Sequence, residues 1–262
     1  MRHVPESKLS LTILSTVVIL CRVNACAQDF PLGVVSHWQY YNNAGTIALK
    51  RGDYATAELK FDAAIAFLRP YQTIDQRLLA RSFTDLAQVL YYQRRYAEAE
   101  PLAKWALQVR ETQSKIKPEA RFQSLFLLAM IHRAQHHGTA AVSLFQQALA
   151  LQEQALGPDH YQVALTLEKL AGIFADLGDS TQAEILFRRA MAIHEKFNPS
   201  ENIALAKLLE HYAAFLRQID RTADAESQET RARKIRNSQT ARRVNSNPNT
   251  STPGFQGFEG FE

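Results

Sequence analysis

A period of 42 residues runs through most of this sequence and limits what the chain can fold into. Alanines recur at this interval, and a second series of alanines follows the first by seven residues. Self-similarity at a fixed spacing of about 20 to 50 residues is the signature of stacked repeats. Five copies of one supersecondary unit are therefore predicted, marked by Ala57, Ala99, Ala141, Ala183 and Ala225 and by Ala64, Ala106, Ala148, Ala190 and Ala232.

The fifth copy differs from the other four. Four residues after the first alanine, the copies have Phe61, Ala103, Phe145 and Phe187, but the last has Glu229. The segment around that glutamate reads ESQETRARKIRNS and is strongly polar. Because the end unit of a repeat stack needs a polar outer face, the fifth copy is predicted to be the C-terminal cap.

Each unit has the pattern of two helices joined by a tight turn. In the second unit, apolar residues recur at the spacing of one face of an amphipathic helix, both before and after a polar break at residues 93–95. The first stripe is Phe83, Leu86, Ala87 and Leu90, and the second is Tyr96, Ala99, Ala103 and Ala106. Glycines at the corresponding breaks of the first and fourth units, Gly52 and Gly178, supply the backbone freedom that ends a helix.

These residues resemble the tetratricopeptide repeat. Its pattern of a small eighth residue, a turn tyrosine and an alanine, aromatic, alanine series is filled in the first unit by Gly45, Tyr54, Ala57, Phe61 and Ala64. The longer period resembles the variety found in kinesin light chains, over roughly residues 37–236. The resemblance implies an all-α fold, a right-handed superhelical α-solenoid of about five helix-turn-helix repeats.

Four positions depart from the pattern of that family. His136 stands where the turn glycine is expected, Gly138 and Ser180 replace the turn tyrosine, and Tyr161 replaces a usual proline. These departures weaken single repeats and leave the assignment of the whole chain intact.

Residues 1–27 are predicted to be a signal peptide outside the repeat domain. Arg2 and Lys8 precede an apolar run from Leu9 to Cys21, and small residues follow it. The run is too short for a transmembrane helix, which needs about 20 residues. Export to a periplasmic or secreted location is therefore expected.

Two ways of processing this signal peptide remain open. Ala25 and Ala27 fit cleavage before Gln28, which would remove both cysteines, Cys21 and Cys26. Alternatively, residues 23–26 resemble a lipoprotein box, in which Cys26 would be acylated and would anchor the protein to a membrane. Neither route leaves a pair of cysteines for a disulfide.

The repeat domain is predicted to cover residues 28–236, and residues 237–262 are predicted to be a disordered tail. Asparagine, serine, threonine, proline and glycine dominate that tail. It ends with Phe255, Phe258 and Phe261 at even spacing, each preceded by glycine. A short docking motif and a passive tail are both compatible with this composition.

No catalytic or cofactor-binding motif is identified. Phosphate-binding loops, nucleophile elbows and paired metal-binding cysteines are missing from the sequence. His132 and His136 have a spacing that could hold a metal on a helix, but a core histidine and a surface histidine explain them more simply. A non-enzymatic protein without a cofactor or metal is therefore expected.

The net charge of +4 is too small to indicate nucleic-acid binding.

In the family that the chain resembles, the first helices of successive repeats line a concave groove that holds a peptide or a helix of a partner. Counted from Trp38, the fifth, ninth and twelfth positions of each unit share one helix face. With Asn43 from a sixth position, the predicted partner-binding residues are Asn42, Asn43, Thr46, Thr84, Gln88, Tyr91, Phe126, Met130, Arg133 and Glu168. Phe126 and Met130 could equally be core residues, because the stretch 126–131 contains no polar residue.

The sequence therefore predicts a non-catalytic interaction module or scaffold that binds a protein segment in its concave groove. The alternative is a lipoprotein, tethered through Cys26, that assists assembly in the cell envelope. Partners of both would be proteins or peptides, without nucleic acid and without a membrane span in the mature chain.

Overall fold

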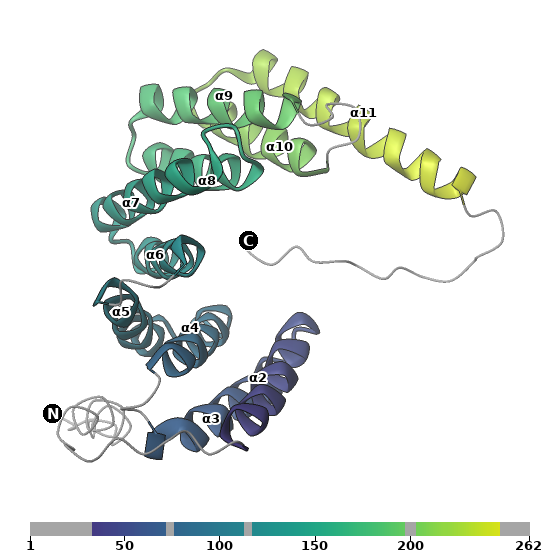
Figure 1. Ribbon diagram of the computed structural model, residues 1–262. Helices are drawn as coiled ribbons and strands as arrows, with labels where there is room; N and C mark the ends of the chain where they lie inside the picture. The colour runs from purple at the N-terminus through teal and green to yellow at the C-terminus, as the bar shows by residue number, and fades with distance from the viewer. Residues whose placement is uncertain (1–32, 72–75, 113–116, 197–202, 247–262) are drawn as a thin grey trace, which may run out of the picture.

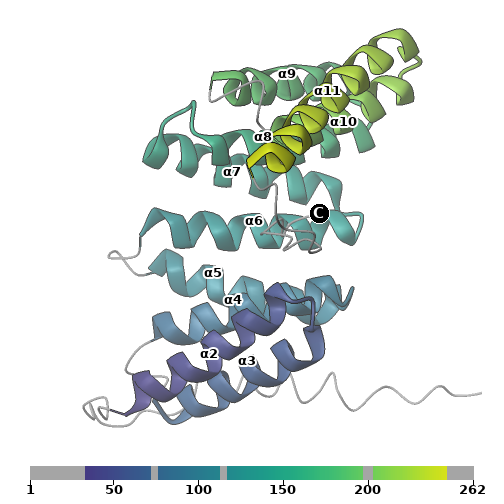
Figure 2. The same ribbon diagram turned by 90° about the vertical axis from the view of Figure 1, so that its right-hand side faces the viewer.

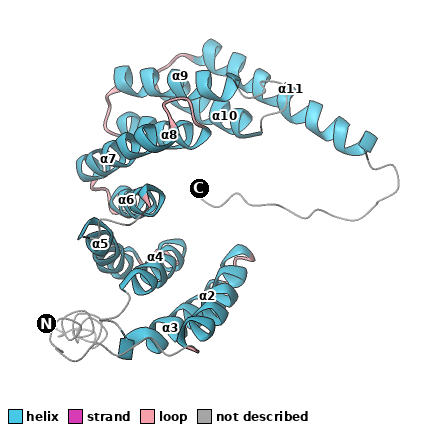
Figure 3. Cartoon of the chain, viewed as in Figure 1, coloured by secondary structure: helices cyan, strands magenta, loops and turns pink. Residues whose placement is uncertain are grey.

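The computed structural model describes residues 33–71, 76–112, 117–196 and 203–246, and these ranges contain ten α-helices and no strand (Figure 3). The helices form five pairs, one for each predicted repeat. They are α2 (Val34–Lys50) with α3 (Tyr54–Leu68), α4 (Gln76–Tyr92) with α5 (Tyr96–Thr112), α6 (Pro118–Ala134) with α7 (Gly138–Leu156), α8 (Tyr161–Asp176) with α9 (Ser180–Lys196), and α10 (Ile203–Gln218) with α11 (Thr222–Ser246).

The pairs stack into a curved, right-handed superhelix. Each helix packs mainly against the helices that precede and follow it in the sequence. The first helix of each pair lies on the inner side of the curve and the second lies on the outer side (Figure 1). Viewed from the open side, the pairs rise in layers from α2 to α11 (Figure 2). Such nearest-neighbour stacking is the architecture of an α-solenoid.

All ten alanines of the 42-residue period are buried. Each of them is at most 1% exposed, so the predicted packing register is confirmed. A related close contact lies inside the first pair, where a Cβ atom on Gly45 would come within 2.7 Å of the ring of Phe61. The helices can approach each other only because the residues at these points are small.

The five turns within the pairs share one backbone geometry, which the sequence revealed only in part. The residue with positive φ falls at the same repeat position each time: Gly52, Arg94, His136, Gly178 and Asp220. In each turn the next residue donates its backbone N–H to a carbonyl five residues earlier, as Arg95 does to Leu90 at 2.8 Å. This pattern is the Schellman motif, and three of the five turns form it without glycine.

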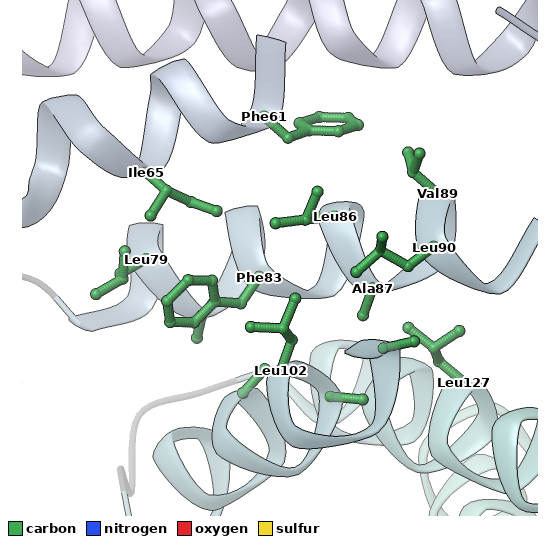
Figure 4. Close-up of a cluster of buried hydrophobic side chains, with 14 of the residues drawn as sticks. Phe61, Ile65, Leu79, Phe83, Leu86, Ala87, Val89, Leu90, Leu102 and Leu127 are labelled. Atoms are coloured by element: carbon green, nitrogen blue, oxygen red, sulfur yellow. The ribbon is translucent and has the colours of Figure 1, made fainter. Parts of the chain in front are cut away.

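A continuous hydrophobic core joins one pair to the next. Figure 4 shows Phe61 and Ile65 of α3 facing the apolar stripe of α4, which includes Phe83 and Leu86. Leu102 of α5 closes the other side of the same stripe. Burial of such side chains contributes about 25 cal/mol per Å² of apolar surface, so every interface between pairs stabilises its two neighbours.

The last helix, α11, covers the end of the core with one apolar face. Ala225, Ala232 and Ile235 are buried, whereas most other side chains of the helix are exposed or half-buried. Glu229, the residue that distinguished this unit, is paired with Arg217 of α10 at 2.9 Å. These contacts agree with the predicted role of the fifth unit as a cap.

The helix α11 extends ten residues past the predicted boundary at Arg236, so the prediction of a disordered tail is wrong for residues 237–246. Residues 237–246 contain no proline or glycine, and the first proline beyond them is Pro248. Nothing in their composition therefore breaks the helix, although the segment is too polar to show the apolar periodicity of a helix.

The predicted signal peptide, with Cys26, and residues 247–262 of the predicted tail lie outside the described residues. Among the described helices, none is long and apolar enough to span a bilayer.

Candidate binding groove

The inner side of the solenoid contains an open groove with a volume of about 1160 Å³. It extends from Thr46 on α2 to His211 on α10, and most of its wall comes from α4, α6, α8 and α10. The second, fifth and sixth positions of the repeats supply much of this wall. In the second to fourth units these residues are Arg81, Thr84 and Asp85, then Gln123, Phe126 and Leu127, then Leu165, Glu168 and Lys169.

Five of the ten predicted binding residues line the groove, namely Thr46, Thr84, Gln88, Phe126 and Glu168. Asn43 is exposed but does not line it. Tyr91 is half-buried and packs its ring against Tyr92 and Tyr96. These positions show that the groove lies about one turn closer to the start of each first helix than predicted.

The prediction that Asn42 and Met130 face the groove is wrong. Met130 is 4% exposed and packs with Phe145 and Ile173 in the core, which was the alternative interpretation of this residue. Asn42 is 1% exposed and donates a hydrogen bond from Nδ2 to Oδ2 of Asp85 at 3.2 Å. It therefore supports the groove wall from behind.

Arg133 does not line the groove either. Its guanidinium pairs with Asp176 at 3.0 Å and lies over Gly172, where an added Cβ would be 3.3 Å from Nη2. Gly172 therefore makes room for an arginine of the protein itself.

Positive charge exceeds negative charge along the groove wall. The cationic residues are Arg77, Arg81, Arg110, Lys117, Lys169 and Lys207, against Asp85, Glu119 and Glu168. The wall therefore carries three more cations than carboxylates when its histidine is neutral. An excess of one sign of charge in a concave wall attracts ligands of the opposite sign.

Asp85 lies among the arginines in the first half of the groove. Burial raises the pKa of Asp85 to about 6, against the opposing effects of Arg81 and of the hydrogen bond from Asn42. Arg110 is also buried, and it donates hydrogen bonds to Ser124 and, at 2.8 Å, to the carbonyl of Ala120. These contacts hold the guanidinium in place at the wall.

Glu168 is held by His211 and Lys169 in the second half of the groove. It is 7% exposed, lies 2.8 Å from Nδ1 of His211, and is 3.6 Å from Nζ of Lys169. Burial by itself raises the pKa of this carboxyl, but the partners outweigh it and hold the pKa below its usual value. Because Glu168 is already satisfied within the protein, it contributes less to ligand binding than its position suggested.

Apolar side chains occupy the middle of the groove. Tyr161 and Leu165 of α8 are 50% and 37% exposed, although both are large and apolar. Half-buried Phe126 of α6 also lines the groove and packs edge-on against Phe145. Sequence reasoning missed Tyr161 and Leu165 as site residues. The signal was the replacement of the usual proline by Tyr161, which places an exposed ring at the start of α8.

Among the described residues, no group of three histidine, cysteine, aspartate or glutamate side chains could hold a metal ion. His132, singled out in the sequence, lies 3.4 Å from His137 between the two Nδ1 atoms, and its Nε2 lies 4.0 Å from Glu100. Burial lowers the pKa of His132, so the ring favours its neutral form. None of these three residues lines the groove.

A family model for the tetratricopeptide repeat matches residues 39–112 and 121–196. The two matched segments cover more than half of the chain and include four of its five helix pairs. A comparison with curated proteins finds no match.

Solved structures with a similar fold include proteins of the kinesin light chain type. BtubC (BKLC) from P. vanneervenii is 19% identical over 98% of this chain and 99% of its own, with a TM-score of 0.68. A putative kinesin light chain from Podosopora anserina is 18% identical over 79% of this chain and 97% of its own, with a TM-score of 0.67.

A third similar structure contains a peptide. It is the Rap conjugation gene regulator of the plasmid pLS20 in complex with the Phr* peptide, which is 12% identical over 95% of this chain and 72% of its own, with a TM-score of 0.61. At these identities the three likenesses establish the fold.

Proposed function

The chain belongs to the tetratricopeptide repeat family, and from this premise we propose that it is a non-catalytic scaffold that binds a peptide or protein segment in its concave groove. Repeat solenoids present extended concave surfaces, and proteins of this architecture use them for binding. The proposal requires no cofactor or metal. Affinity would come from apolar side chains that lose water on binding and from charges of opposite sign around them.

The exposed apolar centre of the groove is the observation that carries this proposal. Tyr161 and Leu165 present apolar surface to solvent within a concave wall that also bears an excess of cations. A contiguous apolar patch with a polar rim is characteristic of an interaction site. The peptide in the similar Rap regulator supports a peptide as the class of ligand.

Substitution of the two exposed apolar residues tests the proposal. We expect Tyr161→Glu with Leu165→Glu to abolish capture of partners from the native compartment, because charged side chains would replace the apolar anchors. Both residues are solvent-exposed, so helical content measured by circular dichroism should stay unchanged. Mass spectrometry of the captured proteins would also identify the partner.

The matched control is Leu59→Glu with Ile185→Glu. These residues are 65% and 54% exposed on α3 and α9, outside the groove, so the control variant should capture partners as the wild type does. Equal capture by the groove variant and the control would contradict the proposed function.

We further propose that the protein is exported by a signal peptide in residues 1–27. The basic start, the apolar run and the small residues before Gln28 support this proposal. A lipid anchor on Cys26 is the alternative. The intact mass of the mature protein distinguishes them, because a chain that begins at Gln28 cannot carry an acyl group on Cys26. A mature chain that still begins at residue 1 would contradict both cleavage before Gln28 and acylation of Cys26.

A further inference from the structure

We propose that residues 255–262 of this chain, FQGFEGFE, bind in the concave groove, so that a partner must displace them. This inference rests on the groove being a peptide-binding site, as proposed above, and it assigns that site a regulator built into the same chain. The segment follows α11 and lies outside the described residues. Three features of the sequence and the groove support the assignment.

The charges of the groove and the segment are complementary. The groove wall carries three more cations than carboxylates. After Arg243 the sequence contains no lysine or arginine, and its only charged side chains are Glu259 and Glu262. Both glutamates fall within the proposed segment. An acidic segment is therefore attracted to the wall, with a strength that falls as salt screens the charges.

The phenylalanine spacing matches the spacing of the first helices. Phe255, Phe258 and Phe261 are three residues apart, which is one turn of a polyproline II helix and about 9 Å, so in that conformation the three rings share one face. Contacts join the first helices α2 and α4, α4 and α6, and α8 and α10, and packed helices lie about 8–10 Å apart. A segment in this conformation across the groove can therefore place successive rings at α4 and α6, or at α8 and α10.

The position of α11 brings the segment to the correct side of the molecule. The C-terminal end of α11 projects beyond α10 toward the side on which the solenoid is open (Figure 1). Viewed from that side, its last turns pass in front of α8 (Figure 2). Eight residues lie between Ser246 and Phe255, so the two Cα atoms can be about 30 Å apart when the chain is extended. The segment therefore starts on the open side of the solenoid, with a reach of about 30 Å from the end of α11.

Photo-crosslinking in the full chain tests this proposal. With p-benzoylphenylalanine in place of Phe258, irradiation should produce a crosslink within one molecule, and its partner peptide should contain Phe126, Tyr161 or Leu165. The control carries the same group in place of Ser143, which is exposed on α7 and outside the groove. Crosslinks that reach only the outer helices, or none above the control, would overturn the proposal.

The same experiment distinguishes other occupants. A crosslinked dimer, in place of a crosslinked monomer, would mean that the segment binds a second copy, and this result would overturn binding within one chain. Glu259→Gln with Glu262→Gln should reduce the crosslink yield several-fold, and the wild-type yield should fall similarly in high salt. A yield insensitive to both changes would contradict the role of charge.

Partner capture separates this inference from the proposed function. If both are correct, Phe255→Ala, Phe258→Ala and Phe261→Ala together should increase capture, because the groove is no longer occupied. A missing crosslink, with capture still lost in the Tyr161→Glu, Leu165→Glu variant, would overturn the inference and leave the proposed function standing. A crosslink to the groove, with partner capture unaffected by that double variant, would overturn the proposed function and leave the inference standing.

Discussion

At the scale of single residues, the ten alanines in register determine how closely the helices approach. Ala141 is fully buried and lies in one cluster with Phe145, Leu170 and Ile173. Because protein interiors are packed about as densely as organic crystals, such a site has no room for three additional carbon atoms. The alanines therefore set the distance between α7 and its neighbours.

We expect Ala141→Leu to lower the free energy of unfolding by about 1–3 kcal/mol through overpacking. Chemical denaturation followed by circular dichroism measures the difference. Ala150→Leu is the control, since Ala150 is exposed on the same helix and leucine is also a good helix former there. Equal stability of the two variants would contradict the assigned packing register.

Asp85 provides a second prediction for a single residue. Because its folded-state pKa of about 6 lies above the ordinary value of 3.8, the neutral carboxyl stabilises the fold at low pH. This contribution is lost as the pH rises through about 6. Asp85→Asn should therefore raise the free energy of unfolding at pH 7.5 by about 1–2 kcal/mol.

The gain from Asp85→Asn should shrink below pH 6 and vanish near pH 4, where the wild-type carboxyl is also neutral. Urea denaturation of both proteins between pH 4 and 7.5 measures this trend. If the difference in the free energy of unfolding between the two proteins is independent of pH, burial of the Asp85 charge is not its cause.

The sequence predicted the helix pairs better than it predicted the groove. The alanine period depends on contacts between neighbouring units, which repeat identically, so the burial of Ala57 or Ala225 follows from spacing alone. Which face of a first helix borders the groove depends on its tilt against both neighbours, and this tilt has no local signal. For that reason Met130 and Asn42 were misplaced by about one turn, and the exposure of Tyr161 and Leu165 was missed.

At the scale of secondary-structure elements, the turns within the pairs are the most regular feature. The left-handed position is a glycine in two turns and Arg94, His136 or Asp220 in the others. A side chain at such a position costs roughly 1–2 kcal/mol in backbone strain, and asparagine tolerates it better than most residues. The turn geometry is therefore imposed by the packing of the two helices as well as by glycine.

We expect Gly178→Ala to lower the free energy of unfolding by about 1 kcal/mol. No atom lies within 4 Å of a Cβ at this position, so the cost would arise from the backbone at φ +82° and not from a clash. Gly178→Asn should cost less, as asparagine adopts this conformation more readily. Thermal or urea denaturation compares the three proteins, and a larger loss for asparagine than for alanine would contradict this explanation.

At the scale of the whole molecule, stability is a sum of contributions from neighbouring pairs. Helices far apart in the sequence share few contacts, and α2 and α11 are at opposite ends of the stack. In such a chain a defect at one end destabilises the adjacent unit much more than the distant units. The solenoid should therefore unfold locally before it unfolds as a whole.

Ala232→Asp tests this locality. Ala232 is 1% exposed in the cluster of α10 and α11 that contains Leu205 and Leu209, so an unpaired carboxylate there is strongly unfavourable. Hydrogen exchange measured by mass spectrometry should rise in α10 and α11 and stay near the wild-type rate in α2 to α5. A uniform increase across all helices would show that the chain unfolds as one cooperative unit.

The stacking of the pairs also gives the groove mechanical properties. Its wall crosses the interfaces between four consecutive units, from α4 to α10, so small rotations at each interface add up along the wall. Slight changes in the superhelical pitch therefore alter the width of the groove. A bound segment that contacts several units would fix the superhelical pitch, so ligand binding would make the solenoid more rigid.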